Sequence, residues 1–387
     1  MTSAASAPLP LAGLVVVELG HSVAAPFGGQ ILGDLGADVI KIEKADGDDA
    51  RKWGPPFLEG AAATFQGLNR NKRSAVCNLR DAGHVAALRQ LILGRTDIVL
   101  QNLRPGQVEE LGLDGASLVR QKPALIYCNL GAFGRKGPLS QRPGYDPLMQ
   151  AFGGIMSVTG EAGQMPVRVG PSIVDMGTGM WAVIGILSAL HRRRETGQGG
   201  VIDVSLFETA ATWVSLVAAH YLASGEVPGK LGSGAPGIVP YRAYRTADGD
   251  LVIAAGNDGL FRKLSAVLGH EEWPQDPRFA TNPERVHNQK ELYGLIEPLV
   301  AQRRNAEWIA ALDAAGVPCA PVQDVRQTLE HEQTRALGLL QAMPRGAMSL
   351  LGLPISFDGA RPEPRRAPPE LGEHTAQVFP DLKRKTP

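Results

Sequence analysis

The chain has 387 residues, more than one domain usually holds, and its 44% hydrophobic content suits a globular protein with a large core. Lys plus Arg and Asp plus Glu number 39 each, so net charge points to neither a nucleic acid nor a membrane surface as partner. The cysteines Cys77, Cys128 and Cys319 form no CxxC pair, which argues against a disulfide framework or a zinc site. No basic stretch precedes the first apolar run and no 18-residue apolar run occurs, so we expect no signal peptide, no membrane span and a cytoplasmic location.

The first half of the chain alternates short β-branched runs with helix-like segments. We expect strands at 14–19 ("LVVVEL"), 38–43 ("DVIKIE"), 97–102 ("DIVLQN") and 124–130 ("ALIYCNL"). Helices are expected at 27–37, 83–93 and 108–113. This alternation predicts an α/β layered domain with a largely parallel sheet, whose strand carboxyl ends are the expected place for ligands.

The second half begins with helical patterns. A long apolar helix is expected over 177–194, ended by a basic cluster and a glycine, and a strand leads into a second long helix over 201–225. The Gly- and Pro-rich segment 226–244 is typical of a loop, and Asp248-Gly249 predicts the turn of a hairpin. Helices should follow to about residue 315, and the last sixty residues are loop-rich.

Motifs of familiar cofactor sites are absent or weak. "FGGQILGDLG" (27–36) lacks the GxGxxG spacing of a dinucleotide loop, so close helix–sheet packing is the better interpretation. The eight histidines have no metal-binding spacing, and we expect no metal. His21, at the end of a strand, could face a ligand or be an ordinary turn residue.

Two aspartates lie at expected helix starts. Asp146 is expected to be the N-cap before Pro147, which leaves its neighbour Tyr145 unexplained. Asp175, in "VGPSIVDMGTGM", is the one charged residue among small and apolar ones. It could cap the long helix, or it could be a carboxylate nucleophile in a small, dry site that glycines make accessible. Local sequence leaves both open.

Six motifs in order make the chain resemble the family III CoA-transferases, the group that contains formyl-CoA transferase, carnitine CoA-transferase and the α-methylacyl-CoA racemases. They are "LAGLVVVELGHSVAAPFGGQILGDLGADVIKIE", "LNRNKRSAVCNLRDAGH", "VLQNLRPGQVEELGL", "RPGYDPLMQAFGGIMSVTG", "VGPSIVDMGTGMWAVIGILSAL" and "ETGQGGVIDVSLFETA", followed by the closing "PPELGEHT" (368–375). The resemblance covers nearly the whole chain.

The resemblance implies that Asp175 is the nucleophile that takes CoA from an acyl-CoA thioester, through anhydride and aspartyl-CoA intermediates, and passes it to a free carboxylic acid. No metal, ATP or tightly bound cofactor is implied, since CoA enters as the substrate. The implied CoA and substrate contacts are Val23, Ala24, Lys44, Leu79, Arg80, Asn102, Leu103, Arg104 and Tyr145. The resemblance also makes dicarboxylates such as succinate the first candidates for the carboxylic acid substrate.

Two departures from the family pattern bear on specificity. Val23 stands where formyl-CoA transferase has a glutamine, and "GSGAPG" (232–237) matches its run of glycines only loosely, which argues against formyl-CoA or oxalate as substrate. The alternative of an α-methylacyl-CoA racemase is disfavoured because those enzymes have "GHD" where this chain has "GYD" at Tyr145. A catalytically silent CoA-binding protein is disfavoured because Asp175 and its glycines are present.

The fold that the resemblance implies is α/β, with a Rossmann-like large domain built from both chain ends, a smaller α+β domain, and an intertwined homodimer. We place the first part of the large domain at 1–195, a linker helix at 196–220, the small domain at 221–324, and the return linker with the C-terminal part of the large domain at 325–387.

Overall fold

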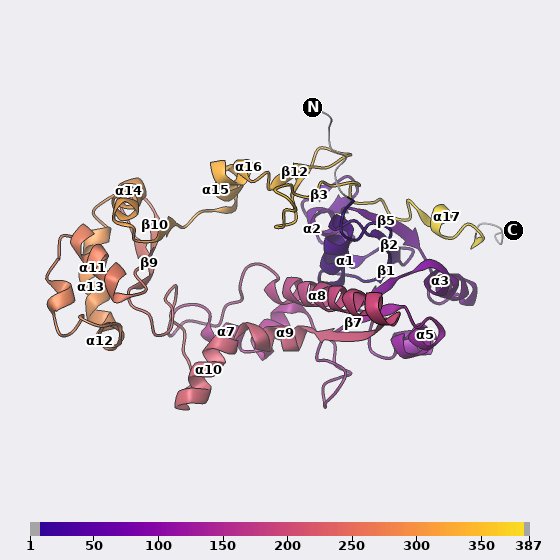
Figure 1. Cartoon of the computed structure of the whole chain (residues 1–387), viewed down its shortest axis with the longest axis horizontal. Coiled ribbons are helices and arrows are strands. Elements are labelled where there is room, and N and C mark those ends of the chain that lie inside the picture. The colour runs from indigo at the N-terminus through magenta and orange to yellow at the C-terminus, as the bar shows by residue number, and fades with distance from the viewer. Residues whose placement is uncertain (1–7, 383–387) are drawn as a thin grey trace. The chain divides into compact units, whose positions relative to one another are not determined.

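The computed structural model describes residues 8–382, so the first seven residues, considered above for a leader peptide, and the last five lie outside it. The chain forms two compact units. The first comprises the chain up to Ile155, Arg168–Ser215, and the chain from Glu332 onward; the second comprises Met156–Val167 and Leu216–His331. Figure 1 shows the path of the chain, coloured by residue number.

The first unit is built on a six-stranded parallel sheet with the order β5-β2-β1-β6-β7-β8. The strands are β1 (Val15–Leu19), β2 (Asp38–Glu43), β5 (Lys72–Val76), β6 (Ile98–Gln101), β7 (Ile126–Gly131) and β8 (Gly200–Ser205). The expected parallel sheet and its four expected N-terminal strands are confirmed. Strand β5 was not expected, because "KRSAV" opens with two cations that suggest an exposed segment; in the structure Lys72 is buried and Arg73 is paired with Asp38.

Helices cover both faces of this sheet, as alternate residues of its central strand show. Val16 belongs to the cluster that α1 (Ala24–Asp34) and α8 (Ile173–Thr196) form on one face. The next residue, Val17, belongs to the cluster formed with α3 (Ala82–Arg95) and α5 (Gly115–Gln121) on the other face. Because consecutive side chains of a strand point to opposite faces, "LVVVEL" is buried on both sides, as its unbroken apolar run predicts.

The remaining elements of the first unit are short. They are η1 (Asp49–Lys52), β3 (Phe57–Leu58), β4 (Ala61–Ala62), α2 (Ala63–Leu68), α4 (Gln107–Glu110), α6 (Asp146–Phe152), α9 (Leu206–Trp213), α16 (Glu332–Ala336), β12 (Leu340–Ala342), β13 (Ser349–Leu351) and α17 (Thr375–Val378). Segment 196–220, expected to be a linker helix, instead contains the sheet's last strand, β8. It then continues into α9, and α10 (Ser215–Ser224) follows after a break at Val214. The Ser205 hydroxyl accepts the Glu208 amide and starts α9 directly at the end of β8.

The end of the chain returns to the edge of the sheet through the motif "PPELGEHT". The His374 amide bonds the Ser74 carbonyl, and the Gly372 amide bonds the Ser74 hydroxyl. The Val76 amide donates to the Thr375 hydroxyl. These bonds fix the C-terminal segment along β5, so both ends of the chain contribute to the first unit.

The second unit has its own sheet and core. The antiparallel strands β9 (Tyr241–Arg245) and β10 (Asp250–Ala254) form the expected hairpin, closed by the Thr246 amide on the Gly249 carbonyl, and β11 (Cys319–Pro321) pairs with β10. Its helices are α11 (Asp258–Val267), η2 (Trp273–Gln275), α12 (Asn282–His287), α13 (Gln289–Val300), α14 (Asn305–Ala315) and α15 (Val325–Glu330), with α7 (Ile155–Val158) at the boundary between the units. The loop before β9 is held by the Gly232 amide on the Gly160 carbonyl.

Helix α8 is long and apolar enough to cross a membrane by length and composition. Half of its most apolar 18-residue stretch is buried inside the protein. Its packing on α1 and the sheet accounts for that composition, as for a core helix.

Candidate active site

Except for Tyr145, the contacts implied by the resemblance follow four adjacent strands at their carboxyl ends. Val23 and Ala24 follow β1, Lys44 follows β2, Leu79 and Arg80 follow β5, and Asn102, Leu103 and Arg104 follow β6. The chain runs outward from β1 through β2 to β5 and then returns to β6 on the other side of β1. The strand order therefore reverses between β1 and β6, which in open parallel sheets is where ligands bind.

The cationic residues at this edge of the sheet differ in whether they are paired with an anion. The Lys44 ammonium lies 2.7 Å from the Asp49 carboxylate and is about half exposed. The side chains of Arg80 and Arg104 are exposed and form no hydrogen bond or ion pair with the described residues. Leu79 and Leu103 pack on the core cluster beneath α3 and α5. Within the described residues, this edge therefore carries two guanidinium groups without a partner, each next in sequence to a leucine that packs on the core.

The loop between β1 and α1 is clamped at the point where the strand order reverses. The Asn102 carbonyl oxygen accepts the His21 amide at 3.0 Å, and its amide nitrogen donates to the His21 carbonyl at 2.9 Å. Asn102 therefore holds the β1 loop to the end of β6. Burial lowers the pKa of His21 below its ordinary value, so its imidazole is neutral at pH 7.

Helices α1 and α8 cross closely at two glycines. A Cβ on Gly179 would lie 2.6 Å from the Ala24 carbonyl oxygen, and one on Gly28 would lie 3.2 Å from the Gly179 carbonyl oxygen. Glycine at both positions allows the start of α1 to lie against α8, one turn beyond Asp175. No side chain caps α1, and within residues 8–382 the amides of Val23 and Ala24 have no acceptor.

Asp175 lies in the first turn of α8, and its carboxylate forms no hydrogen bond with the described residues. The helix begins at Ile173, so Asp175 is inside it and is not its cap. Burial, and next the negative charge of Asp146, raise the pKa of Asp175 to about 7. A partly buried carboxylate without hydrogen bonds, near an uncapped helix start, can act as a nucleophile or a base.

Asp146 caps α8 in place of Asp175. One of its oxygens accepts the amides of Val174 at 2.8 Å and Asp175 at 3.1 Å, and the other accepts the Gln150 side-chain amide at 2.6 Å. Asp146 was expected to cap its own helix, and this was wrong: Tyr145 is the N-cap of α6 and Asp146 serves the neighbouring helix. Tyr145 is 59% exposed and precedes the residue that touches the Asp175 amide.

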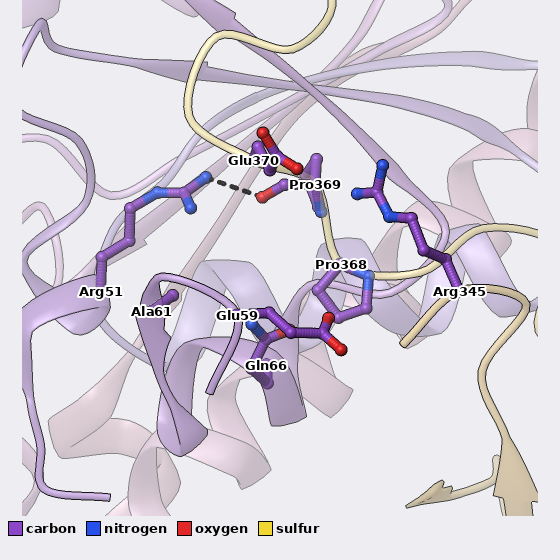
Figure 2. A pocket seen from close by; sticks show the side chains of 8 residues that line it. All are labelled: Arg51, Glu59, Ala61, Gln66, Arg345, Pro368, Pro369 and Glu370. Atoms are coloured by element: carbon purple, nitrogen blue, oxygen red, sulfur yellow. Dashed lines mark hydrogen bonds between the residues drawn. The ribbon is translucent and has the colours of Figure 1, made fainter. Parts of the chain in front are cut away.

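A pocket of about 140 Å³ lies elsewhere in the first unit (Figure 2). It is lined by Arg51, Glu59, Ala61, Gln66, Arg345, Pro368, Pro369 and Glu370. Arg51 donates to the Pro369 carbonyl from one side, and Arg345 pairs with Glu373 on the other. None of the implied CoA contacts lines this pocket. No group of three or more His, Cys, Asp or Glu residues suited to a metal occurs within residues 8–382.

Sequence reasoning missed a set of buried charges beneath the β1 loop. Glu18, Lys41 and Lys72 are fully buried; both lysines pair with Glu18, and Lys41 also pairs with Asp48. The signal was visible, because a charged residue stands inside each of the apolar runs "LVVVEL" and "DVIKIE".

The sequence matches the model of CoA-transferase family III over residues 11–375. It is 37% identical to the succinate–glutarate CoA-transferase of Agrobacterium fabrum, over 99% of this chain and 98% of that protein. It is 36% identical to the acetyl-CoA:oxalate CoA-transferase of Acetobacter aceti, over 95% of each. The crystal structure of a CaiB/BaiF family protein from Brucella suis is 40% identical, with a TM-score of 0.86 over 97% of this chain and 100% of that one. Because these matches span the chain in both sequence and fold, the protein belongs to CoA-transferase family III and is a CoA-transferase.

Proposed function

We propose that the protein moves CoA from an acyl-CoA thioester to a free dicarboxylic acid, with Asp175 as the nucleophile. The observation that carries the proposal is the state of this carboxylate. It is partly buried, has no hydrogen bond with the described residues, and is relieved of capping its helix by Asp146. A carboxylate with only a structural role in a helix start would be expected to bind backbone amides.

The proposed reaction keeps an activated acyl bond at every step. The Asp175 carboxylate attacks the thioester carbonyl, giving a mixed anhydride and CoA thiolate. The thiolate attacks the Asp175 carbonyl, giving an aspartyl-CoA thioester and releasing the donor acid. The acceptor carboxylate attacks this thioester and forms a second anhydride. The returning thiolate then attacks the acceptor's acyl carbonyl, which releases the new acyl-CoA and restores Asp175.

Each attack places negative charge on a carbonyl oxygen, so donors near Asp175 should lower the barriers. The amides of Val23 and Ala24 suit this role, because they have no acceptor among the described residues and lie at an uncapped helix start packed on α8. The first amides of α8 do not, because Asp146 already accepts two of them. We assign the developing oxyanion to the start of α1.

The remaining implied contacts fit the CoA end of the substrate. Arg80 and Arg104 are exposed and unpaired in the described structure, so their guanidinium groups suit the nucleotide phosphates. The two relatives are named for succinate, glutarate and oxalate, which are dicarboxylates. We therefore propose short dicarboxylates as acids, with succinate and glutarate ahead of oxalate because Val23 replaces the glutamine of formyl-CoA transferase.

We also propose a homodimer, intertwined as the family resemblance implies. Helix α8 exposes an apolar stripe of Met180, Trp181, Ile184 and Leu187, each 38–49% exposed. A stripe of this spacing runs along one face of the helix and suits burial against a second copy. Light scattering on the purified chain tests the mass.

The experiment that tests the function is a matrix of acyl-CoA donors against carboxylic acids, with thioester products identified by mass. We expect transfer between succinyl-CoA and glutarate, and its loss by on the order of 10³-fold in Asp175→Asn. The asparagine keeps the size and capping capacity of the side chain but cannot form the anhydride. Near-normal turnover in this variant would remove Asp175 from the chemistry.

A further inference from the structure

A closed set of four buried charges lies between the sheet and the start of α1. Lys41 pairs with Glu18 at 2.9 Å and with Asp48 at 2.8 Å, and Lys72 pairs with the other oxygen of Glu18 at 2.8 Å. Glu18, Lys41 and Lys72 are fully buried, and Asp48 is 4% exposed. The two cations balance the two anions, and none of the four is among the residues assigned above to CoA or to the chemistry.

Buried ion pairs such as these contribute little net free energy of folding. Removing charges from water is unfavourable, and apolar residues of similar volume often stabilise a core as well or better. The set also restricts position 29 of α1 to glycine, because a Cβ there would lie 2.0 Å from a Glu18 carboxylate oxygen. The backbone groups that these side chains bind therefore suggest a role besides packing.

Two of the four hold the backbone between β1 and α1, and a third holds the first turn of α1. The Lys41 ammonium donates to the Gly20 carbonyl at 2.7 Å, and an Asp48 oxygen accepts the Ser22 amide at 3.0 Å. Lys72 donates to the Pro26 carbonyl at 2.7 Å, inside the first turn of α1. The bonds therefore fall before, within and after the turn that carries the amides of Val23 and Ala24.

The turn itself needs this support. Ser22 has a φ of +68°, a left-handed conformation that costs a residue with a Cβ free energy unless its surroundings hold it. Its amide is held by Asp48, and the neighbouring His21 backbone is held by Asn102. Glu43 supports Asp48 in turn by accepting its amide at 2.9 Å, and Arg51 binds both oxygens of Glu43.

We propose that Asp48, together with Lys41, Glu18 and Lys72, is a positioning device that holds the left-handed turn at Ser22 and thereby aims the first amides of α1 at the reacting carbonyl. These residues touch neither substrate nor reacting atoms; they act through the backbone of the turn. The inference rests on the proposed function of the site, since it assigns the oxyanion to those amides.

The test compares Asp48→Asn with a matched variant, Asp34→Asn. Asp34 is also 4% exposed and also binds a cation, Arg70, but it lies at the far end of α1. Both variants should lose similar thermal stability. In Asp48 one oxygen accepts the Ser22 amide and the other faces the Lys41 ammonium, so the single oxygen of an asparagine cannot serve both and the turn loses support. We expect only Asp48→Asn to lower kcat for CoA transfer, by on the order of 10–100-fold, with KM for acyl-CoA changed less than about threefold, because misplaced groups affect the transition state more than binding.

Two further measurements separate positioning from general damage. Hydrogen exchange of the amides in residues 20–25 should accelerate in Asp48→Asn and stay at the wild-type rate in Asp34→Asn. Adding Ser22→Gly to Asp48→Asn should recover part of kcat, because glycine adopts the left-handed turn without the support that was lost. If Asp48→Asn does not fold, Asp48→Glu keeps the charge beside Lys41 but displaces the acceptor from the Ser22 amide, and faster exchange at residues 20–25 is expected there too.

The outcomes distinguish this inference from the proposed function. If the wild-type chain transfers no CoA, the proposed function fails, and the exchange measurements alone decide whether Asp48 holds the turn. If the wild type transfers CoA but Asp48→Asn matches Asp34→Asn in kcat and in exchange, the set is structural and the positioning role is wrong. Loss of kcat confined to Asp48→Asn, faster exchange and recovery with Ser22→Gly together support it.

Discussion

The carboxylate of Asp146 accepts a hydrogen bond from the backbone amide of Asp175, 3.1 Å away, although 29 residues separate the two aspartates. The contact caps α8 from outside and leaves the Asp175 side chain free. It also brings two negative groups together, which adds to burial in raising the pKa of Asp175 to about 7. The same residue thus leaves the side chain of the proposed nucleophile free and, after burial, contributes to the rise in its pKa.

This arrangement predicts the pH dependence of the reaction. Only the ionised carboxylate can attack a thioester, so kcat/KM should rise as pH increases through about 7, the pKa of Asp175 in the free enzyme. Asp146→Asn removes the nearby charge but keeps an oxygen that can accept the Val174 and Asp175 amides. The rising limb should therefore move to lower pH. If the rise of kcat/KM in Asp146→Asn occurs at the wild-type pH or at a higher pH, the charge of Asp146 does not raise the pKa of Asp175.

The raised pKa also predicts an effect on stability. The unfolded Asp175 has a pKa near 3.8, so between about pH 4 and pH 7 the native state holds a proton that the unfolded state has lost. The contribution of this group to the free energy of unfolding therefore falls as pH rises through that window, and above pH 7 the ionised carboxylate destabilises the fold. Asp175→Asn should raise Tm by a few degrees at pH 8 and by little at pH 4. Thermal scans at the two pH values measure this. Asp250→Asn in the second unit, where the aspartate side chain is 41% exposed, is a control that should show no such gain.

Parts of this site are readable from sequence and parts are not. The strand–helix alternation predicts the parallel sheet, and "GHSVAAP" predicts a loop at a strand's end. Asp175 is conspicuous as a charge among small residues. Its partner Asp146 is not predictable, because capping of α8 from α6 depends on how two helices meet and not on spacing along either one. The charges of Glu18 and Lys41 stand out within apolar strands, but their pairing follows only from the strand order.

Tyr145 gives a prediction about the related racemisation chemistry. Racemases of this family carry a histidine at this position, and the tyrosine here lacks the imidazole nitrogen that would accept the proton. Incubation with a chiral 2-methylacyl-CoA in deuterated water should therefore leave the α-carbon free of deuterium over many transfer turnovers. Tyr145→His serves as the comparison, because it restores the missing base. Rapid deuterium uptake by the wild-type chain would mean that a second base exists.

The covalent role of Asp175 is the central claim, and trapping the intermediate tests it most directly. The enzyme is mixed with succinyl-CoA in the absence of an acceptor acid, quenched in acid, digested and analysed by mass. We predict that the peptide containing Asp175 carries CoA as a thioester, that hydroxylamine removes it, and that adding glutarate before the quench depletes it. A peptide without CoA while transfer proceeds at its normal rate, or CoA attached to a different residue, would contradict the account.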